Sequence, residues 1–357
     1  MKITKFNFLL MLFTILLFSC SQEDETLEPT DIEFAYDVKS KIQYSKINVL
    51  YKGFAGARGG EQMLVFPDKE TFLQTIIELE RQTEELDDAF IEFYSDLDEE
   101  QINEKEEEIG FNENVPIYGF NDELGFESLF QKIAEEEEEW LAQEELDLSE
   151  DPDDYFVDDE GYRAVLNADN EVQVGESIYK LTEEGYFQIT DGNVESLREI
   201  GGKSTGRIAL PENIIFVPNK NYDENGRVSA SGHKSSKSDS GFKKIGDRRI
   251  KWKVKHATPF FGSRHVYAQT KNYKKKGRRW KKYRTYVYAQ VYGNISGSGG
   301  NCNTQVDFNP GLISSNSKSN KKKVKHKIWV QTKTKSGWVK GNHNGAGGVE
   351  YKSTLTF

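Results

Sequence analysis

The sequence predicts a fold in two parts, an acidic α+β domain followed by a basic, all-β domain. The charge divides sharply along the chain. Residues 233–357 carry 29 Lys and Arg against four acids, a net charge of +25, whereas residues 1–232 carry 18 against 55, a net charge of −37. Amphipathic helical periodicity is confined to the acidic part, and short alternating segments rich in Tyr, Trp, Val and Thr fill the basic part. With 357 residues, the chain is long enough for two domains that each bury a core.

The first twenty residues have the features of an export signal. Two lysines precede an apolar run, Phe6 to Phe18, which is shorter than the about 20 residues that a transmembrane helix needs. The run ends in Leu17-Phe18-Ser19-Cys20, which resembles the lipobox of bacterial lipoproteins. The resemblance implies that residues 1–19 are a signal peptide and that Cys20 is lipidated, so a lipid anchor would hold the protein at a membrane. The alternative is an ordinary cleaved signal followed by a chance cysteine.

Residues 20–30 predict an acidic tether, with Glu23-Asp24-Glu25 close behind the cysteine. A short acidic segment at this place resembles the signal that sends Bacteroidetes-type lipoproteins to the cell surface. The resemblance implies an outer membrane lipoprotein that faces outward, and a solvated tether without a signal is the alternative. The segment Leu166 to Lys180, LNADNEVQVGESIYK, also resembles one in uncharacterised lipoproteins of Bacteroidetes. Their function is unknown, so this likeness implies lineage and location only.

The acidic domain is predicted to span residues 31–228. Loose alternation up to Tyr51 and the apolar run Met63 to Phe66 predict strands. Asp68 is a suitable N-cap for an amphipathic helix of about 25 residues, because apolar side chains follow it at spacings of three and four up to Phe93.

Three further predictions concern the rest of the acidic domain. Residues 98–124 are acidic and poorly periodic, which predicts a mobile connection with one short helical turn at most. A second helix is predicted from about Phe126, although the five glutamates at 135–139 repel one another. The acidic residues around Asp151 predict a solvated loop, and residues 164–181 predict a strand, a tight turn at 168–171 and a second strand.

A linker and the basic domain complete the chain. Residues 229–241 are rich in Ser and Gly, which is typical of a linker, and the basic domain is predicted to span residues 242–357. In this domain Ile250, Trp252 and Val254 alternate with lysines, so one face of the strand is apolar and the other carries ammonium groups. Several short strands of this kind predict a two-sheet β-sandwich or a small barrel.

Basic clusters next to aromatic side chains predict a polyanion-binding site in the basic domain. Ammonium and guanidinium groups neutralise phosphate, sulfate or carboxylate, while rings stack on bases or sugars. The ligand would be an acidic glycan, lipopolysaccharide phosphate or nucleic acid. The predicted residues are Lys274, Lys275, Lys276, Arg278, Arg279, Trp280, Lys281, Lys282, Tyr283, Lys321, Lys322 and Lys323.

The same clusters are compatible with two roles that involve no external polyanion. The acidic domain could dock on the basic one, which would make the protein a structural or assembly component of the envelope with a possible envelope protein partner. Lysines on strand edges also prevent aggregation without binding any ligand. The sequence leaves all three roles open.

The sequence contains no recognisable catalytic or cofactor motif. The five histidines lack metal-binding spacing, the acidic loops lack the spacing of a calcium site, and Gly201-Gly202-Lys203-Ser204-Thr205 lacks the upstream glycine of a phosphate-binding loop. No metal and no cofactor are therefore expected. Lipidation of Cys20 would leave Cys302 without an intrachain partner, as a passive thiol. A carboxylate-dependent glycan hydrolase remains an alternative, because the fold alone can bring two carboxylates together.

Overall fold

The structure is a computed structural model that describes residues 34–35, 39–53, 62–200, 210–218, 237–257, 261, 265–299, 302–308, 314–327, 333–345 and 349–356. The chain divides into two compact units, Met1–Asp37 and Val38–Phe357. Of the first unit only residues 34 and 35 are described, so the predicted signal peptide, Cys20 and the acidic tether lie outside the described residues. No helix within the described ranges is long and apolar enough to cross a bilayer.

A six-stranded sheet forms part of the second unit. Its strands lie in chain order: β1 (Asn48–Tyr51), β2 (Gln62–Phe66), β3 (Glu171–Val174), β4 (Ser177–Thr182), β5 (Gly185–Ile189) and β6 (Ile214–Pro218). β2 and β3 are parallel, with Val65 opposite Gln173, and their neighbours are antiparallel. The parallel pairing follows from the long helical crossover between these two strands, since a tight turn cannot join parallel strands.

The helical elements of the second unit occur mostly in that crossover. They are η1 (Tyr44–Lys46), α2 (Lys69–Phe93), α3 (Glu99–Ile109), α4 (Val115–Leu124), α5 (Leu129–Leu141), η2 (Leu148–Glu150), η3 (Pro152–Asp154), α6 (Glu160–Val165) and α7 (Ser196–Ile200). The predicted long helix is confirmed as α2: the side chain of Asp68 accepts a hydrogen bond from the backbone N–H of Thr71 at 2.7 Å. Phe72 and Leu79 on its apolar stripe are fully buried.

The prediction of a mobile connection over residues 98–124 is wrong, because two helices fill this range. α3 begins with a capping box in which Asp98 and Gln101 satisfy each other's backbone N–H groups. It ends at Gly110, whose φ of 63° belongs to the left-handed region that favours glycine. The predicted second helix is found as α5, which starts with a further capping box at Ser128.

The prediction of a strand, a tight turn at 168–171 and a second strand is partly wrong. Residues 160–165 form α6, because Asp159 caps a helix there by accepting a hydrogen bond from the N–H of Tyr162. The strand pair is β3 with β4, and the turn that joins them follows Val174.

The basic part of the chain forms two five-stranded sheets. One contains β7 (Lys237–Ile245), β8 (Arg248–Ala257), β9 (His265–Lys276), β10 (Arg279–Lys282) and β14 (Lys321–Lys327). The other contains β11 (Thr285–Gly299), β12 (Cys302–Phe308), β13 (Ser314–Ser319), β15 (Lys333–Gly345) and β16 (Val349–Thr356). Residues 237–241 of the predicted linker are therefore strand, and residues 229–236 lie outside the described residues.

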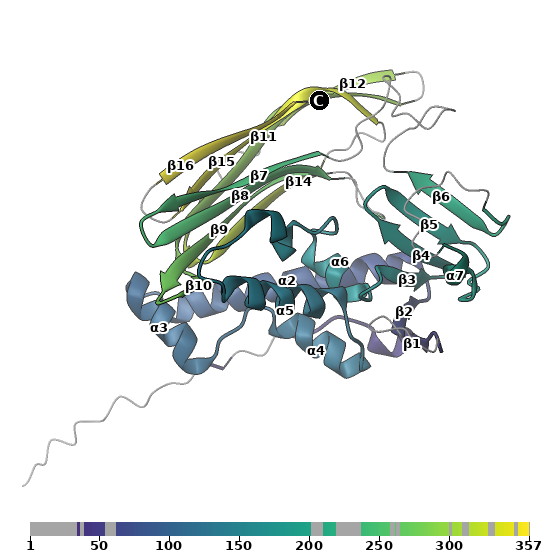
Figure 1. Ribbon diagram of the computed structural model, residues 1–357, viewed down its shortest axis with the longest axis horizontal. Coiled ribbons are helices and arrows are strands. Elements are labelled where there is room, and N and C mark those ends of the chain that lie inside the picture. Colours follow the sequence, from purple (N-terminus) through teal and green to yellow (C-terminus); the bar gives the residue numbers. More distant parts are fainter. Residues whose placement is uncertain are drawn as a thin grey trace, which may run out of the picture. The chain divides into compact units, whose positions relative to one another are not determined.

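The two sheets face each other in Figure 1, and one apolar core lies between them. This core contains side chains of both sheets: Val254, Val266, Ala268 and Val324 from the first, and Ala289, Val291, Ile295, Val339 and Leu355 from the second. The described strands close no barrel, so of the two predicted architectures the sandwich is found.

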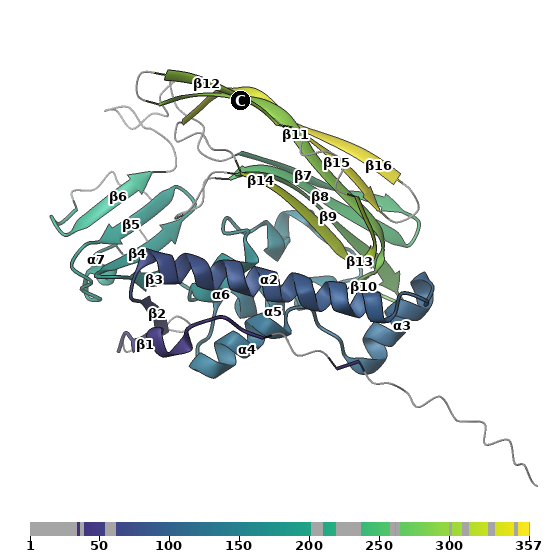
Figure 2. The ribbon, with the colours of Figure 1, turned by 180° about the vertical axis from the view of Figure 1, so that it is seen from behind.

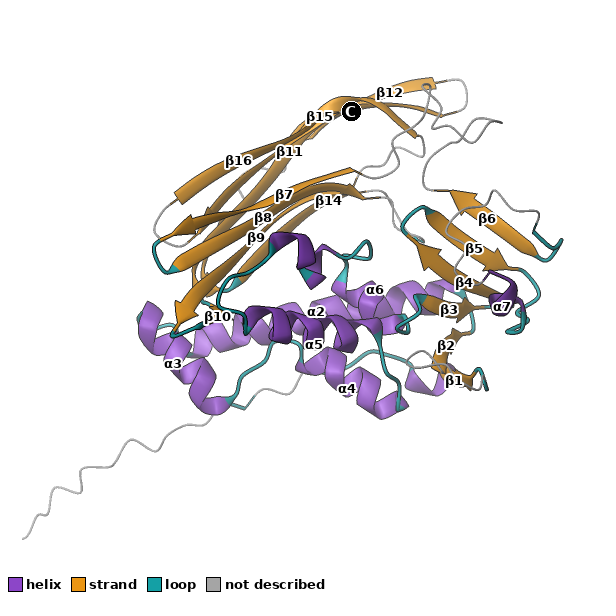
Figure 3. Cartoon of the chain, viewed as in Figure 1, coloured by secondary structure: helices purple, strands orange, loops and turns teal. Residues whose placement is uncertain are grey.

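A layer of helices covers one outer face of this sandwich. α2 runs along the sheet that contains β9 and β14, with α5 and α6 beside it (Figures 1 and 2). In Figure 3 the helices, drawn in purple, gather on this side of the sandwich. The contact surface between this layer and the sandwich carries most of the charge described below.

Candidate functional site at the charged interface

Strand β8 is buried on both of its faces. Ile250 and Val254 point into the sandwich and are 2% and 0% exposed. Lys251 and Lys253, on the opposite face, are 3% and 5% exposed. The predicted division of this strand into an apolar and an ammonium face is thus found, but the ammonium face lies under the helical layer. A buried ammonium group must be paired, because desolvation of an unpaired charge is very costly.

The aspartates around η3 supply the paired charges. Lys251 Nζ lies 2.6 Å from Asp151 Oδ2 and 3.1 Å from Asp153 Oδ2, and Lys271 Nζ lies 2.9 Å from the same Asp153 oxygen. The prediction of a solvated acidic loop here is wrong, since Asp151 and Asp153 are each 7% exposed. Although burial raises the pKa of Asp153, Lys271, Lys251 and Arg163 outweigh this effect and hold that pKa well below its ordinary value.

Strand β14 repeats the arrangement with its own alternating lysines. Lys321 Nζ lies 2.8 Å from Glu160, and Lys325 Nζ lies 2.9 Å from Asp159. Both acids stand at the start of α6, where the helix dipole also favours negative charge. The pKa of Glu160 is lowered to about 2, because Lys321 and Lys271 outweigh the effect of burial. This carboxylate is therefore ionised at neutral pH.

Arg284 forms a third cluster, at the junction of β10 and β11. Its side chain is fully buried, and its guanidinium lies 2.7 Å from Asp87 of α2 and 3.0 Å from Glu106 of α3. The rings of Phe90 and Phe111 lie 4.7 and 5.2 Å from it. Burial raises the pKa of Glu106 to about 7, despite the neighbouring guanidinium.

These ion pairs all join the same two parts of the chain. Among the described residues, eighteen ion pairs join a base between positions 248 and 325 to an acid between positions 80 and 160. We call this surface the charged interface. The basic and the acidic parts of the chain therefore neutralise each other here, and the pairs around Asp151 and Asp153 are also shielded from solvent.

The structure brings the predicted polyanion-binding residues together along one edge of β9. β10 pairs with the end of β9, so Lys281 stands opposite Lys274, and β14 pairs with the same edge, so Lys321 stands opposite Lys271. No sequence signal indicated that separate lysine clusters would meet here, because the pairing depends on a strand that comes about 40 residues later in the chain.

Most of the predicted cations are engaged within the chain. Lys276 and Lys281 both pair with Glu107, at 2.8 and 2.9 Å, and Lys282 pairs with Glu137 at 2.9 Å. Lys274 contacts Glu100, and Lys275 contacts the backbone oxygen of Glu144. Lys321 contacts Glu160, and Lys323 contacts Asp159. Arg278, Arg279 and Lys322 make no ion pair with a described residue.

The two predicted stacking rings are buried. Trp280 is 2% and Tyr283 is 7% exposed. Arg249 lies 4.2 Å from the ring of Trp280, and Arg248 lies 5.0 Å from that of Tyr283. Cations of the chain therefore occupy the position next to these rings that a base or sugar would need.

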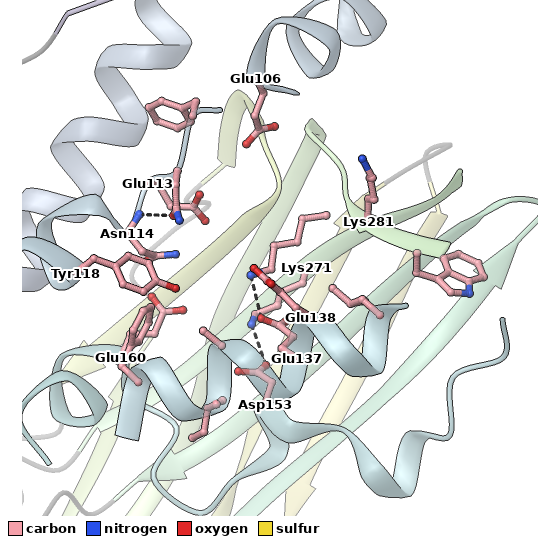
Figure 4. A pocket seen from close by; sticks show the side chains of 18 of the residues that line it. Glu106, Glu113, Asn114, Tyr118, Glu137, Glu138, Asp153, Glu160, Lys271 and Lys281 are labelled. Atoms are coloured by element: carbon pink, nitrogen blue, oxygen red, sulfur yellow. Dashed lines mark hydrogen bonds and ion pairs between the residues drawn. The ribbon is translucent and has the colours of Figure 1, made fainter. Parts of the chain in front are cut away.

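A cavity of about 600 Å³ adjoins the charged interface. Figure 4 shows its lining, with Glu113, Asn114 and Tyr118 on one side and Glu137, Asp153 and Lys271 on the other. Its walls come from α3, α4 and α5 and from β9 and β10. No local motif indicates this site, because its lining residues are spread from position 106 to 282. Within the described ranges, no group of His, Cys, Asp and Glu side chains could hold a metal ion.

Comparison with known proteins assigns no function. No family model and no curated protein matches the chain. Among solved structures, the chain is similar to a DUF4848 family protein from Bacteroides thetaiotaomicron at 11% identity and a TM-score of 0.17, with 83% of this chain and 97% of that chain covered. A likeness at this identity and TM-score supports no conclusion about function.

Proposed function

We propose that this chain is a lipid-anchored structural protein of the bacterial cell envelope, whose acidic helical layer and basic β-sandwich hold each other through the charged interface. The observation that carries the proposal is the burial of Lys251, Lys253 and Lys271 against the aspartates of the η3 segment. A sheet face built to bind a soluble polyanion would keep its ammonium groups accessible. Here the chain supplies the anions itself.

The alternative, an external polyanion as ligand, is less well supported. A glycan or nucleic acid would have to displace Glu107 from Lys276 and Lys281, and Glu137 from Lys282. Of the ten predicted cations, only Arg278, Arg279 and Lys322 lack an acidic or backbone partner among the described residues. Three cations of this kind supply little of the electrostatic free energy that polyanion binding requires.

Heparin chromatography of the mature chain distinguishes the two functions. Because the acids cover the lysine face, we expect the protein to elute at low salt, despite the net charge of +25 on residues 233–357. The double variant Asp151→Asn, Asp153→Asn should be retained longer, because it removes the acid that pairs with Lys271 and leaves Lys251 only Asp154, at 3.4 Å. Glu195→Gln is the matched control, since it breaks an exposed ion pair with Arg198 away from the interface. Strong, salt-sensitive retention of the wild-type protein would favour the polyanion function instead.

The anchor is a separate part of the proposal. It rests on the lipobox-like Leu17-Phe18-Ser19-Cys20 and on the acidic residues that follow, which also support exposure at the outer membrane surface. Labelled fatty acid should enter the protein in growing cells and should be absent after Cys20→Ala. Protease added to intact cells should digest the protein if it faces outward, and an unlabelled wild-type protein would contradict the anchor.

A further inference from the structure

The outer face of the second sheet of the sandwich has no part in the charged interface. Figures 1 and 2 show β11, β15 and β16 on the side away from the helical layer, and no described helix or strand lies over their outer face. Val291, Ile295 and Val339 point into the core and are fully buried, so the residues between them point outward. The outer platform is defined as the outward side chains of β11 from Tyr288 to Asn294, with those opposite them on β12, β15 and β16.

Two aromatic rings meet on this platform. Tyr292 of β11 and Trp338 of β15 stand edge to face, with ring centroids 6.0 Å apart and an angle of 83° between the ring planes. Trp338 is 37% exposed, and Tyr292 is half-buried. Lys340 Nζ lies 5.0 Å from the Trp338 ring, but this ring keeps an accessible surface, unlike the buried ring of Trp280. The platform therefore offers rings on which the C–H face of a ligand can pack.

Amide side chains surround the two rings. Gln290 stands opposite Asn342, and Asn294 stands opposite Trp338. Asn342 Nδ2 donates a hydrogen bond to Gln290 Oε1 at 2.7 Å, and the hydroxyl of Tyr288 donates to the same oxygen at 2.9 Å. The three amides are partly exposed, so these bonds orient them without covering them. An amide group has both donor and acceptor atoms, which suits it to hydroxyl groups in either role.

The charges of the platform balance among its described side chains. Lys340 and Lys352 stand against Glu350 and Asp307, so the face has no net charge that would attract a polyanion. None of the described side chains of the platform is aliphatic. The buried centre of a protein–protein interface is mainly apolar, which this mixture of amides, hydroxyls and balanced charges does not provide.

The platform is also elongated. At a rise of about 3.4 Å per residue, the stretch from Tyr288 to Asn294 is about 20 Å long, and the three strands β11, β15 and β16 span about 10 Å. An open sheet face of this size suits an extended chain of several rings better than one small molecule, which a concave site would surround.

We infer that the outer platform binds an extended polysaccharide. The C–H faces of its sugar rings pack on Tyr292 and Trp338, and its hydroxyl groups exchange hydrogen bonds with Gln290, Asn294 and Asn342. Ring contacts and hydrogen bonds carry this binding, whereas the charges of the platform cancel. The inference goes beyond the proposed structural function, because it gives the sandwich an external ligand on the face that the helical layer leaves uncovered.

Isothermal titration calorimetry of the mature chain tests the inference. The probes are soluble mixed-linkage β-glucan, galactomannan, xylan and dextran. We expect at least one of them to bind, with an affinity that changes less than about twofold between about 50 and 500 mM NaCl, because ring contacts are not screened by salt. Trp338→Ala and Tyr292→Ala each remove one of the two rings and should each weaken this binding about tenfold.

Tyr51→Ala is the matched control. It also removes an exposed aromatic ring, which is 68% accessible, but Tyr51 belongs to β1 in the six-stranded sheet. Its affinity should equal that of the wild-type protein. Melting curves of each variant establish that it is folded.

Four results would overturn the inference. They are no binding of any of the four polysaccharides, loss of binding at high salt, an equal loss of affinity in Tyr51→Ala and Trp338→Ala, and a wild-type dimer that Trp338→Ala dissociates in sedimentation velocity. The last result would assign the platform to a second copy of this chain. None of these variants alters the charged interface, so each result leaves the heparin test of the proposed function unaffected.

Discussion

Arg284 allows a quantitative test of the buried charge clusters. Its fully buried guanidinium is shared by Asp87 and Glu106, and the ring of Phe90 lies 4.7 Å from it. Arg284→Met keeps much of the side-chain volume and removes the charge, so two buried carboxyls lose their counter-ion. The side chain of Asn103 accepts a hydrogen bond from the backbone N–H of Arg284 and donates one to its backbone oxygen, at 2.8 Å each. These bonds do not involve the Arg284 side chain and should persist in the variant.

The loss of stability in Arg284→Met should depend on whether Asp87 and Glu106 are charged. Removing one partner of a buried ion pair typically costs about 3–5 kcal/mol. Burial already raises the pKa of Glu106 to about 7, and it also raises the pKa of Asp87, so both carboxyls can take up a proton when the guanidinium is gone. We therefore expect a loss of about 3 kcal/mol in the free energy of unfolding at pH 8. At pH 5 the carboxyls of the variant are protonated more easily, and the loss should fall to about 1 kcal/mol.

Urea denaturation followed by tryptophan fluorescence measures both values. Arg248→Met is the matched control, because Arg248 also pairs with an acid of the helical layer, Glu99, at 2.7 Å, but both side chains are partly exposed, at 26% and 37%. An exposed pair contributes at most about 1 kcal/mol. If Arg284→Met destabilised the protein no more than Arg248→Met, or equally at both pH values, the account of a buried, desolvated cluster would be refuted.

Three further predictions concern pH and backbone geometry. Burial raises the pKa of Glu106 from 4.5 to about 7, so its stabilising contribution is complete below pH 4.5 and is lost as the pH rises to 7. The free energy of unfolding, measured between pH 5 and 8, should therefore fall with rising pH. Glu106→Gln should flatten this decline. Glu160 changes the stability with pH in the opposite direction. Lys321 outweighs its burial and lowers its pKa to about 2, so its stabilising contribution is lost as the pH falls from 4.5 to 2. Glu160→Gln should reduce this loss of stability. Gly337 has a φ of 134°, and a Cβ there would collide with the backbone oxygen of Asn294; Gly337→Ala should lower the melting temperature strongly, whereas Gly119→Ala, where a Cβ meets open space, should not.

The helical layer shows which local signals are sufficient for prediction. α2 could be predicted because Asp68 marks its start and an apolar stripe continues to Phe90. α3 was missed because it buries a single apolar side chain, Ile102, and so has no stripe to detect. Its capping box, Asp98 with Gln101, is present in the sequence and would have indicated a helix start. The acidic segment α3 is helical because the cap satisfies backbone N–H groups at its start and because bases of the sandwich pair with its acids.

The candidate site shows where local patterns stop being informative. Alternation along β8 predicts a lysine face, but it does not predict what covers that face, because the partners of Lys251 lie 98 and 100 residues earlier. Asp151 and Asp153, which look solvated in the sequence, are therefore buried in the fold. The cavity is equally non-local, since Asn114, Glu137 and Trp280 come from three separate elements. Pairing over such distances is set by the packing of whole layers, which no short motif encodes.

The acids of the helical layer cover and neutralise the lysine face of the sandwich. Reductive methylation of lysines in the native protein, read by mass spectrometry, measures whether these lysines are covered. Lys251, Lys253 and Lys271 are 3%, 5% and 6% exposed, so they should stay unmodified while the exposed Lys243, Lys244 and Lys340 react. Equal rates of modification in the two groups would contradict the claim.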